Sequence, residues 1–386
     1  MCPPLTFGVE FEFSLAAALN GSPDPHPSHP GRALYPEIQR VHAFCDYINS
    51  SFHQAGLPTQ RRQTQDSRFW YTHVDTTVSP PHKDAPCQST EYKWHPMEVN
   101  SPAYYFLPEA LDQVRVACAV ITSNYRAVPV RSAGLHMHVG NGVEGFSFET
   151  VRNLVSLLWV FERQFSTLHP PHRHDGQWCS PLSKMSVYGH HPRNFRQGRQ
   201  IGIFEVLEEL FSDEWHDMDR LVWQMGHVCN RGCAVKFANL TGPVQGTKKT
   251  IEFRQHASTL DGEETVMWIK TVVGLLEFAR DVDEVQFTKL MIEFAEVGPE
   301  EFTVVQLLRK IGLKEQASYY STRLYPLDVH EDDIGLEFRS QNLAEPRLDV
   351  LERFGVSMSG KSKPMATDVT LQAPPRPPPP LEALEW

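Results

Sequence analysis

The feature that constrains this chain most is a strict alternation of apolar and polar residues near its N-terminus. Between residues 5 and 14, every second side chain is large and apolar: Phe7, Val9, Phe11 and Phe13. The positions between them hold Gly8, Glu10, Glu12 and Ser14. Because successive side chains point to opposite faces of a strand, this pattern predicts a strand with one buried apolar face and one polar face.

Three further segments repeat this alternation with chemically active residues on the polar side. His136 and His138 alternate with apolar neighbours in residues 135–139, and this segment lies between two glycines that permit close approach of another group. Glu252 and Arg254 alternate with apolar neighbours in residues 250–256, and Glu98 stands between Met97 and Val99. Each segment therefore predicts a strand with metal-ligand or phosphate-binding side chains on one face.

Carboxylates at positions i and i+2 of a strand lie roughly 6.5–7 Å apart and repel one another unless a positive charge lies between them. A divalent cation would satisfy them, and carboxylate oxygens with one imidazole suit Mg²⁺ or Mn²⁺. Each motif also has a simpler interpretation, as a solvated outer face or a surface ion pair. Their shared parity favours a metal-and-phosphate site on an open sheet.

The rest of the pattern predicts strands interspersed with helices. Helices are expected over residues 36–55, from Pro108 onward, and over 149–168, 203–228 and 263–281, and a further strand over 68–76. Few of these helices have the pattern of a short crossover between two parallel strands. The chain therefore predicts an α+β fold, with a mixed or antiparallel sheet and helices on one face.

Composition excludes several classes of protein. No apolar stretch approaches the roughly 18 residues of a membrane helix, and the first residues lack the pattern of a signal peptide. The seven cysteines are odd in number and scattered, which argues against a disulfide framework. A net charge of −11 disfavours nucleic-acid binding. We therefore expect a cytoplasmic protein that binds neither nucleic acid nor membrane. The sequence does not indicate its oligomeric state.

The expected domain covers residues 1–355, with 200–230 as a candidate insertion. Residues 356–386 contain Pro374, Pro375 and the run from Pro377 to Pro380. Such a segment buries little apolar surface, so it predicts a disordered or polyproline II tail.

The polar strands carry a resemblance to a known family. Residues 8–13, 98–102, 133–140 and 250–256 resemble, in this order, the motifs of the fungal putative amidoligase family. Arg173 with the segment 179–182, and the pair Asn239–Leu240, are also similar to that family. The family belongs to the carboxylate–amine ligase superfamily of glutamine synthetase and glutamate–cysteine ligase.

This resemblance implies a glutamine-synthetase-like domain, in which a curved, mostly antiparallel sheet forms a funnel with helices outside. ATP and two or more Mg²⁺ or Mn²⁺ ions would lie within it. Glu12 and Glu98 would hold one metal ion, and Glu10, His136 and Glu252 a second. His138 would lie against the ATP phosphates, and Arg254 would bind the transferring phosphoryl group.

The implied activity is ATP-dependent formation of an amide from a small carboxylate and an amine, through an acyl phosphate. Asp75 is a candidate to hold or deprotonate the amine, or it is a turn-forming residue before Thr76 and Thr77. Two alternatives stay open. One is phosphoryl transfer to a guanidino or carboxylate group, and the other is a non-catalytic relative that binds a nucleotide or metabolite. The substrates, which include amino acids and peptides as candidates, are not identified.

Several remaining residues favour simpler interpretations. Lys248 and Lys249 indicate a solvated turn more than a phosphate contact, and the histidines at 169, 172 and 174 indicate a polar loop more than a zinc site. Cys229 and Cys233 have the spacing of one helix face and are interpreted as ordinary thiols. We expect core or helix-face positions for Trp178, Trp215 and Trp223.

Overall fold

A central antiparallel sheet organises the molecule. The computed structural model describes residues 4–19, 22–24, 42–59, 67–81, 92–191, 201–212, 217–229, 232–241, 248–327 and 348–355. Within these ranges the sheet has eight strands in the order β2-β3-β1-β6-β8-β7, while β4 and β5 each pair with β1. The strands are β1 (Thr6–Ala18), β2 (Tyr71–His73), β3 (Tyr92–Asn100), β4 (Tyr104–Tyr105), β5 (Ala127–Val128), β6 (Leu135–Gly140), β7 (Val235–Lys236) and β8 (Thr250–Phe253).

The long strand β1 lies at the middle of this sheet. It pairs with β3 and β4 on one side and with β6 and β5 on the other, always antiparallel. The remaining pairs, β2 with β3, β6 with β8 and β7 with β8, are antiparallel as well. The four polar motifs of the sequence are therefore neighbours, because β3, β1, β6 and β8 are consecutive in the sheet.

The apolar face of β1 is buried in the core. Phe7, Phe11 and Phe13 are each at most 1% exposed. The ring of Phe11 stacks on that of Trp70 with 6.4 Å between centroids, and the indole N–H of Trp70 donates to the Tyr104 hydroxyl at 2.9 Å. Burying aromatic side chains of this size contributes much of the folding free energy. The alternation in the sequence therefore fixes which face of the sheet the helices cover.

The helices begin at recognisable capping residues. Pro108 occupies the first turn of α2, Ser147 caps α3 by accepting from the N–H of Thr150, and Asp261 caps α9. The main helices are α1 (His42–Gln54), α2 (Pro108–Asn124), α3 (Phe148–Val160), α4 (Glu162–Ser166), α7 (Ile203–Leu210), α8 (Met218–Gln224), α9 (Gly262–Asp281), α10 (Glu284–Phe294), α11 (Val304–Lys310), α12 (Lys314–Tyr320) and α14 (Leu348–Arg353). Short turns of helix occur at η1 (Pro171–Arg173), α5 (Leu182–Met185), α6 (Val187–His190) and η4 (Ala238–Leu240).

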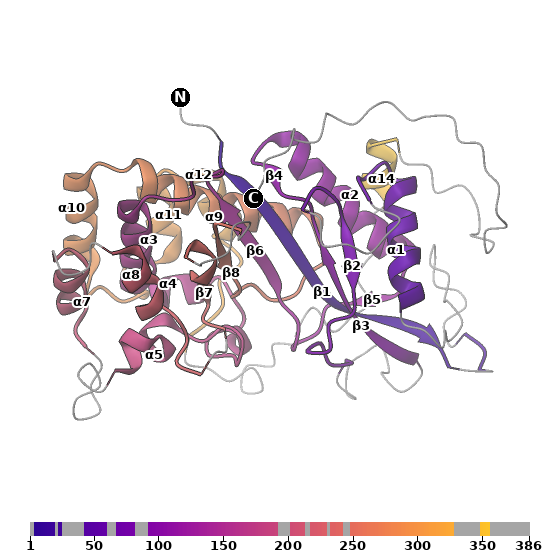
Figure 1. The fold of residues 1–386 in the computed structure, drawn as a ribbon, viewed down its shortest axis with the longest axis horizontal. Helices are drawn as coiled ribbons and strands as arrows, with labels where there is room; N and C mark the ends of the chain where they lie inside the picture. Colours follow the sequence, from indigo (N-terminus) through magenta and orange to yellow (C-terminus); the bar gives the residue numbers. More distant parts are fainter. Residues whose placement is uncertain are drawn as a thin grey trace.

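The helices gather toward the two ends of the sheet. In Figure 1, α1, α2 and α14 lie at the right end, near β2 and β3, and α3, α7 and α10 lie at the left end. Apolar side chains of α1, α2, α3 and α9 belong to the same core as the phenylalanines of β1. The helices therefore cover the apolar face of the sheet, and the polar face keeps its charged side chains.

These observations confirm the expected combination of helices with an antiparallel sheet, while the funnel shape stays a prediction. The helix expected over 149–168 is interrupted at Phe161, where α3 ends and α4 begins. The helix expected over 203–228 is two short ones, α7 and α8, with residues 213–216 outside the described ranges. The strand expected over 68–76 is only three residues long, because the chain turns after His73.

Among the helices that the structure describes, none combines the length and the apolar composition needed to cross a bilayer. The Pro-rich tail and residues 36–41 of the first expected helix lie outside the described residues.

Candidate active site

The polar faces of β1, β6 and β8 bring three potential metal ligands together. In the antiparallel register, Glu10 stands opposite His136, and His138 stands opposite Glu252. Glu10, His136 and Glu252 each offer a ligand atom, and these atoms lie within 4.8 Å of one another. We call these three residues the β1–β8 cluster.

Positive groups surround the β1–β8 cluster. His138 Nε2 lies 3.0 Å from Glu10 Oε1, and Lys236 Nζ lies 3.1 Å from Glu252 Oε2. Arg254 also donates from Nη1 to the other carboxylate oxygen of Glu252. The two carboxylates of this cluster therefore have cationic or hydrogen-bonding partners within the protein.

These partners keep both carboxylates ionised. Burial acts to raise the pKa of Glu252, but His138 and Arg254 outweigh it and bring the pKa to about 2. Burial likewise opposes ionisation of Glu10, whose pKa nevertheless falls well below its usual value because of His138 and His136. Burial would lower the pKa of His138, yet Glu10 raises it. The cluster is thus a set of mutually stabilised charges.

A second group of carboxylates lies on the other side of β1. Glu12 stands opposite Glu98 of β3, and Asp75 follows the end of β2 by two residues. Glu12, Asp75 and Glu98 each offer an oxygen, and these oxygens lie within 4.8 Å of one another. We call these three residues the β1–β3 cluster.

The β1–β3 cluster has few compensating charges. The backbone N–H of Gly134 donates to Glu12 Oε2 at 2.7 Å, and His136 Nδ1 lies 3.2 Å from Glu12 Oε1. His73 Nε2 lies 3.5 Å from Glu98 Oε1, but burial lowers the pKa of His73 and so favours its neutral form. No arginine or lysine is paired with these three carboxyl groups within the described ranges.

The pKa values reflect this lack of compensation. Burial, followed by repulsion from Glu10 and Glu12, raises the pKa of Glu98 to about 8. Burial also raises the pKa of Glu12, although His136 acts in the opposite direction. Near neutral pH, the protein alone therefore does not stabilise the fully ionised form of the β1–β3 cluster.

Asp75 forms the predicted turn, while its role toward the amine stays a prediction. Its Oδ1 accepts hydrogen bonds from the backbone N–H and the hydroxyl of Thr77, each at 2.8 Å, which is a turn-forming arrangement. The same carboxylate lies within 4.8 Å of oxygens of Glu12 and Glu98. The turn thus holds the carboxylate in place beside the cluster.

Arg254 is held in position by backbone groups. Its Nε donates to the carbonyl of Trp178 at 3.2 Å, and its own carbonyl accepts from Nη2 of Arg173. A Cβ at Gly232 would lie only 2.4 Å from the Trp178 carbonyl and 2.8 Å from Arg254 Nε. A glycine at 232 is therefore required for this close approach.

A cavity of about 530 Å³, part of which is open to solvent, lies over both clusters. We call it the acidic pocket, and it is lined by Glu10, Glu12, Asp75, Thr77, Glu98, Ser132, His136, Arg173, Trp178 and Arg254. It therefore combines the carboxylates of the β1–β3 cluster and of Glu10 with two guanidinium groups.

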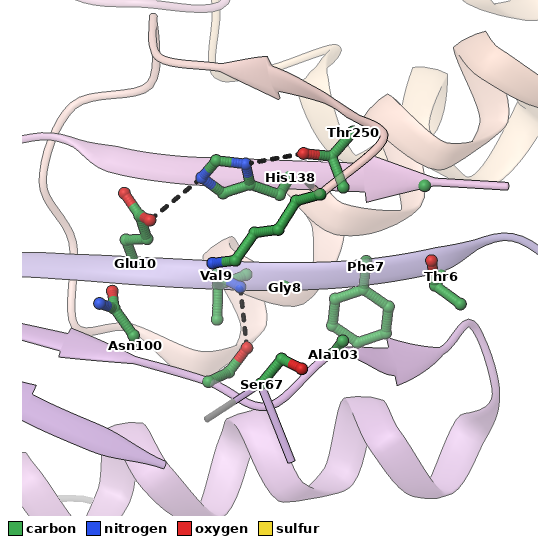
Figure 2. A pocket seen from close by; sticks show the side chains of 13 residues that line it. Thr6, Phe7, Gly8, Val9, Glu10, Ser67, Asn100, Ala103, His138 and Thr250 are labelled. Atoms are coloured by element: carbon green, nitrogen blue, oxygen red, sulfur yellow. Dashed lines mark hydrogen bonds and ion pairs between the residues drawn. The ribbon is translucent and has the colours of Figure 1, made fainter. Parts of the chain in front are cut away.

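A second cavity of about 510 Å³ adjoins it and shares Glu10. We call it the β1 pocket, and it is lined by Thr6, Phe7, Gly8, Val9, Glu10, Ser67, Asn100, Ser101, Ala103, His138, Gly140, Lys248 and Thr250. Figure 2 shows Glu10, His138 and Thr250 along one side of the pocket and Asn100, Ser67 and Ala103 along the other. Among the described residues that line it, Glu10 is the one acidic residue.

His138 links the β1 pocket to β8. Its Nδ1 lies 3.2 Å from the hydroxyl of Thr250, which accepts from the Asn239 side chain at 3.3 Å. Together with the contact from Nε2 to Glu10, this fixes the orientation of the imidazole (Figure 2). Of the eight residues proposed from the sequence for metal, phosphate or amine binding, seven line one or both of these pockets: Glu10, Glu12, Asp75, Glu98, His136, His138 and Arg254. The eighth, Glu252, has a carboxylate oxygen within 4.8 Å of ligand atoms of Glu10 and His136. Their roles stay predictions.

Two expectations about exposure were wrong. The simpler interpretation of the motifs placed the polar sides of the strands in solvent, but Glu12 is 6% exposed and Glu252 is 3% exposed. Glu12 of β1 is flanked by β3, and Glu252 of β8 lies between β6 and β7, so neighbouring side chains exclude most of the water. Trp178 was expected in the core or on a helix face, yet it lines the acidic pocket and is 36% exposed. It follows the irregular turn at residues 171–176, which no periodic pattern could reveal.

Lys248 and Gly8 belong to the candidate site, although neither was predicted from the sequence as a binding residue. Both line the β1 pocket. A usable signal was present, because Lys248 shares the parity of Thr250, Glu252 and Arg254, and Gly8 shares that of Glu10. The polar face of each strand simply extends one step further than the predicted metal ligands.

The other cysteine and histidine predictions have mixed outcomes. Cys229 lies in a turn and Cys233 in an isolated bridge with Ser180, so the two do not share a helix. His169 is buried and packs edge-on against Trp268 with 4.9 Å between centroids. Within the described residues, the two clusters defined above are the groups that could hold a metal ion, and no His-rich group is among them.

Known proteins provide an independent comparison. A family model described as "putative amidoligase enzyme" matches residues 3–276. No curated protein sequence matches the chain. Among solved structures, a bifunctional glutathione synthetase from Pasteurella multocida is similar at 13% identity and a TM-score of 0.39. That alignment covers 91% of this chain and 53% of the synthetase, so the chain spans about half of its length.

Proposed function

Because this chain belongs to the putative amidoligase enzyme family, we propose that it is an ATP-dependent carboxylate–amine ligase of the glutamine synthetase and glutamate–cysteine ligase superfamily. The observation that carries this proposal is the arrangement of the two clusters, which lie side by side on β1 with a pocket on either side of Glu10. This arrangement suits transfer of a phosphoryl group from one pocket to the other.

The β1–β3 cluster fits a divalent cation. Glu12, Asp75 and Glu98 are hard oxygen donors, and the raised pKa of Glu98 reflects carboxylates that repel one another. The β1–β8 cluster adds two carboxylates and one imidazole, a set that Mg²⁺ or Mn²⁺ accepts. Cations bound at these clusters would neutralise phosphate oxygens and so assist phosphoryl transfer.

The β1 pocket fits the nucleotide. An ideal Cβ on Gly8 would have no atom closer than 3.7 Å, so the fold itself has room for a side chain there. The glycine instead leaves the floor of the pocket open. The pocket ends at Glu10 and His138, where the phosphates would reach the clusters.

The acidic pocket fits the reacting carboxylate and amine. Arg254 would neutralise the transferring phosphoryl group there, since its guanidinium lies beside Glu252 and lines the pocket. The substrate carboxylate oxygen forms a bond to the γ-phosphorus as the bond to ADP breaks. The amine nitrogen then attacks the carbonyl carbon, the carbon–oxygen bond to phosphate breaks, and phosphate leaves with the electron pair. Asp75, which lines this pocket, would accept the proton from the amine.

A binding experiment tests the nucleotide pocket first. Isothermal titration calorimetry with ATP and Mg²⁺ should show binding to the wild type and none to Gly8→Val, whose side chain would enter the β1 pocket. Circular dichroism and the melting temperature verify that the variant folds. Equal binding by both proteins would place the nucleotide elsewhere.

Product analysis then tests the reaction. Pools of carboxylic acids and amines are screened for release of ADP, and an active acid is prepared with ¹⁸O in its carboxylate. Ligation through an acyl phosphate yields an amide and transfers ¹⁸O to inorganic phosphate. ADP with a stable phosphorylated product would instead support the phosphotransferase alternative. Binding of ATP without turnover of any acid would support a non-catalytic relative.

A further inference from the structure

Lys248 occupies a distinctive place on the polar face of β8. It precedes the strand by two residues and shares the parity of Thr250, Glu252 and Arg254. It lines the β1 pocket, and it lies close enough to His138 to act on the charge of that imidazole. The polar side of this segment therefore presents a row of side chains that runs from Arg254 at the acidic pocket to Lys248 at the β1 pocket.

The charge of Lys248 is not compensated as the neighbouring charges are. Lys236 and Arg254 both pair with Glu252. For the side chain of Lys248, no ion pair or hydrogen bond is found with any residue in the described part of the chain, and its backbone carbonyl accepts from the N–H of Thr250. Glu10, the acid that lines the same pocket, is already in contact with His138 and His136. An exposed ammonium at the edge of a pocket is thus available for an anionic ligand.

The adjacent lysine shows that this placement is specific. Lys249 points away, with its Nζ 3.4 Å from the carbonyl oxygen of Glu144 and its carbon chain against Gly145. It has opposite parity and does not line the β1 pocket. The two lysines share solvent exposure and charge, so they form a matched pair that differs mainly in direction.

Resting on the proposed function, we infer that Lys248 binds the α-phosphate of the nucleotide and fixes the direction in which the nucleotide lies along β8. The reacting γ-phosphate lies at the Arg254 end, next to the acidic pocket. Glu252 and Glu10 face the middle of the chain of phosphates, and Lys248 reaches the end nearest the nucleoside. Positions 248 and 254 are six residues apart, about 20 Å along a strand. A triphosphate is shorter than this, so the flexible lysine side chain leans inward to meet it.

Nucleotides of different length test this orientation. The affinities of MgATP, MgADP, AMP and adenosine are measured by calorimetry for the wild type, Lys248→Ala, Lys248→Arg and Lys249→Ala. Lys248→Ala should weaken MgATP, MgADP and AMP by the same factor, about tenfold, because all three nucleotides carry the α-phosphate. Adenosine affinity should not change, Lys248→Arg should recover most of the loss, and Lys249→Ala should match the wild type.

The outcomes separate this inference from the proposed function. If Lys248→Ala binds MgATP as the wild type does, the inference is wrong while the ligase proposal stands. A loss confined to MgATP would place Lys248 at the γ-phosphate and reverse the orientation. If the wild type binds neither MgATP nor MgADP, both the proposed function and the role of Lys248 fail.

Discussion

Glu10 and Glu12 are only two residues apart on β1, yet the two clusters to which they belong differ in how their charges are balanced. Glu10 and Glu252 of the β1–β8 cluster contact His138, Lys236 and Arg254, and their pKa values are lowered. The β1–β3 cluster places three carboxyl groups together with a neutral-favouring histidine, and the pKa of Glu98 rises to about 8. The protein alone therefore stabilises the ionised carboxylates of the β1–β8 cluster. The β1–β3 cluster would need an added positive charge to be fully ionised near neutral pH.

This difference predicts which cluster should bind a cation in the absence of nucleotide. A cation at the β1–β3 cluster relieves repulsion between carboxylates and has no lysine or arginine to displace. A cation at the β1–β8 cluster competes with existing ion pairs, so it gains more when it arrives together with phosphates. We therefore expect the first ion at the β1–β3 cluster and a second ion only with ATP.

The largest expected effect is on turnover, where both clusters should matter. Glu12→Gln and Glu252→Gln should each lower ATP turnover by about 10²–10³-fold or more, since each removes a charge from the phosphoryl-transfer site. Steady-state ADP release measures this effect. Glu293→Gln, which changes an exposed glutamate of α10 paired with Lys310, serves as the control and should keep full activity. Full activity of both cluster variants would refute the metal assignment.

Cation binding without nucleotide should separate the clusters. Mn²⁺ titrated in the absence of ATP and followed by electron paramagnetic resonance should occupy a site that Glu98→Gln weakens strongly. The loss should exceed the roughly 10–100-fold typical of removing an outer-shell partner. Glu252→Gln should leave this first site unchanged and remove only the additional Mn²⁺ bound with ATP. The reverse pattern would invert the comparison.

In the absence of metal, Glu252→Gln and Glu12→Gln should differ in their effect on the stability of the protein. Glu252→Gln removes the charged partner of Arg254 and Lys236, which should cost about 1–3 kcal/mol and lower the melting temperature by several degrees. Glu12→Gln replaces a buried carboxylate whose pKa is raised by burial, so the melting temperature should stay the same or rise. Differential scanning calorimetry with a chelator present measures both. A similar loss in the two variants would contradict the difference in charge balance.

The pH dependence of stability should follow from Glu98. Its pKa rises from 4.5 to about 8 on folding, so the folded state binds more protons between these values. This contribution to stability is complete below pH 4.5 and is lost as pH rises toward 8. The metal-free melting temperature should therefore decline from pH 5.5 to 8.5, and less so in Glu98→Gln. Saturating Mg²⁺ should also flatten the decline, with release of about one proton per ion near pH 7.

The smallest effect is expected from the Pro-rich tail. Its composition offers little apolar surface to bury, so truncation after Ser357 should leave the melting temperature nearly unchanged. Both cluster-specific effects above should persist in the truncated protein. A large drop in melting temperature would show that the tail contributes to the stability of the domain.

The main strands and their polar faces could be predicted from the sequence because alternation is a local property. The parity of Glu10, Glu12, His136 and Glu252 follows from counting residues along each strand. Helices with clear periodicity were predicted well: the start of α2 at Pro108, and the bounds of α9, lie close to those observed. The break at Phe161 and the short β2 were not, because each depends on packing rather than on a local pattern.

The sequence by itself thus determined which residue types share a face and which face enters the core. Only the tertiary structure decided which strands are neighbours, and therefore that Glu12 meets Asp75 and Glu98 while Glu252 meets Lys236 and Arg254. Side-chain parity is fixed within each strand, whereas strand order and burial depend on contacts between segments far apart in the chain. For this reason charge balance, exposure and the direction of Lys248 could be obtained only from the folded molecule.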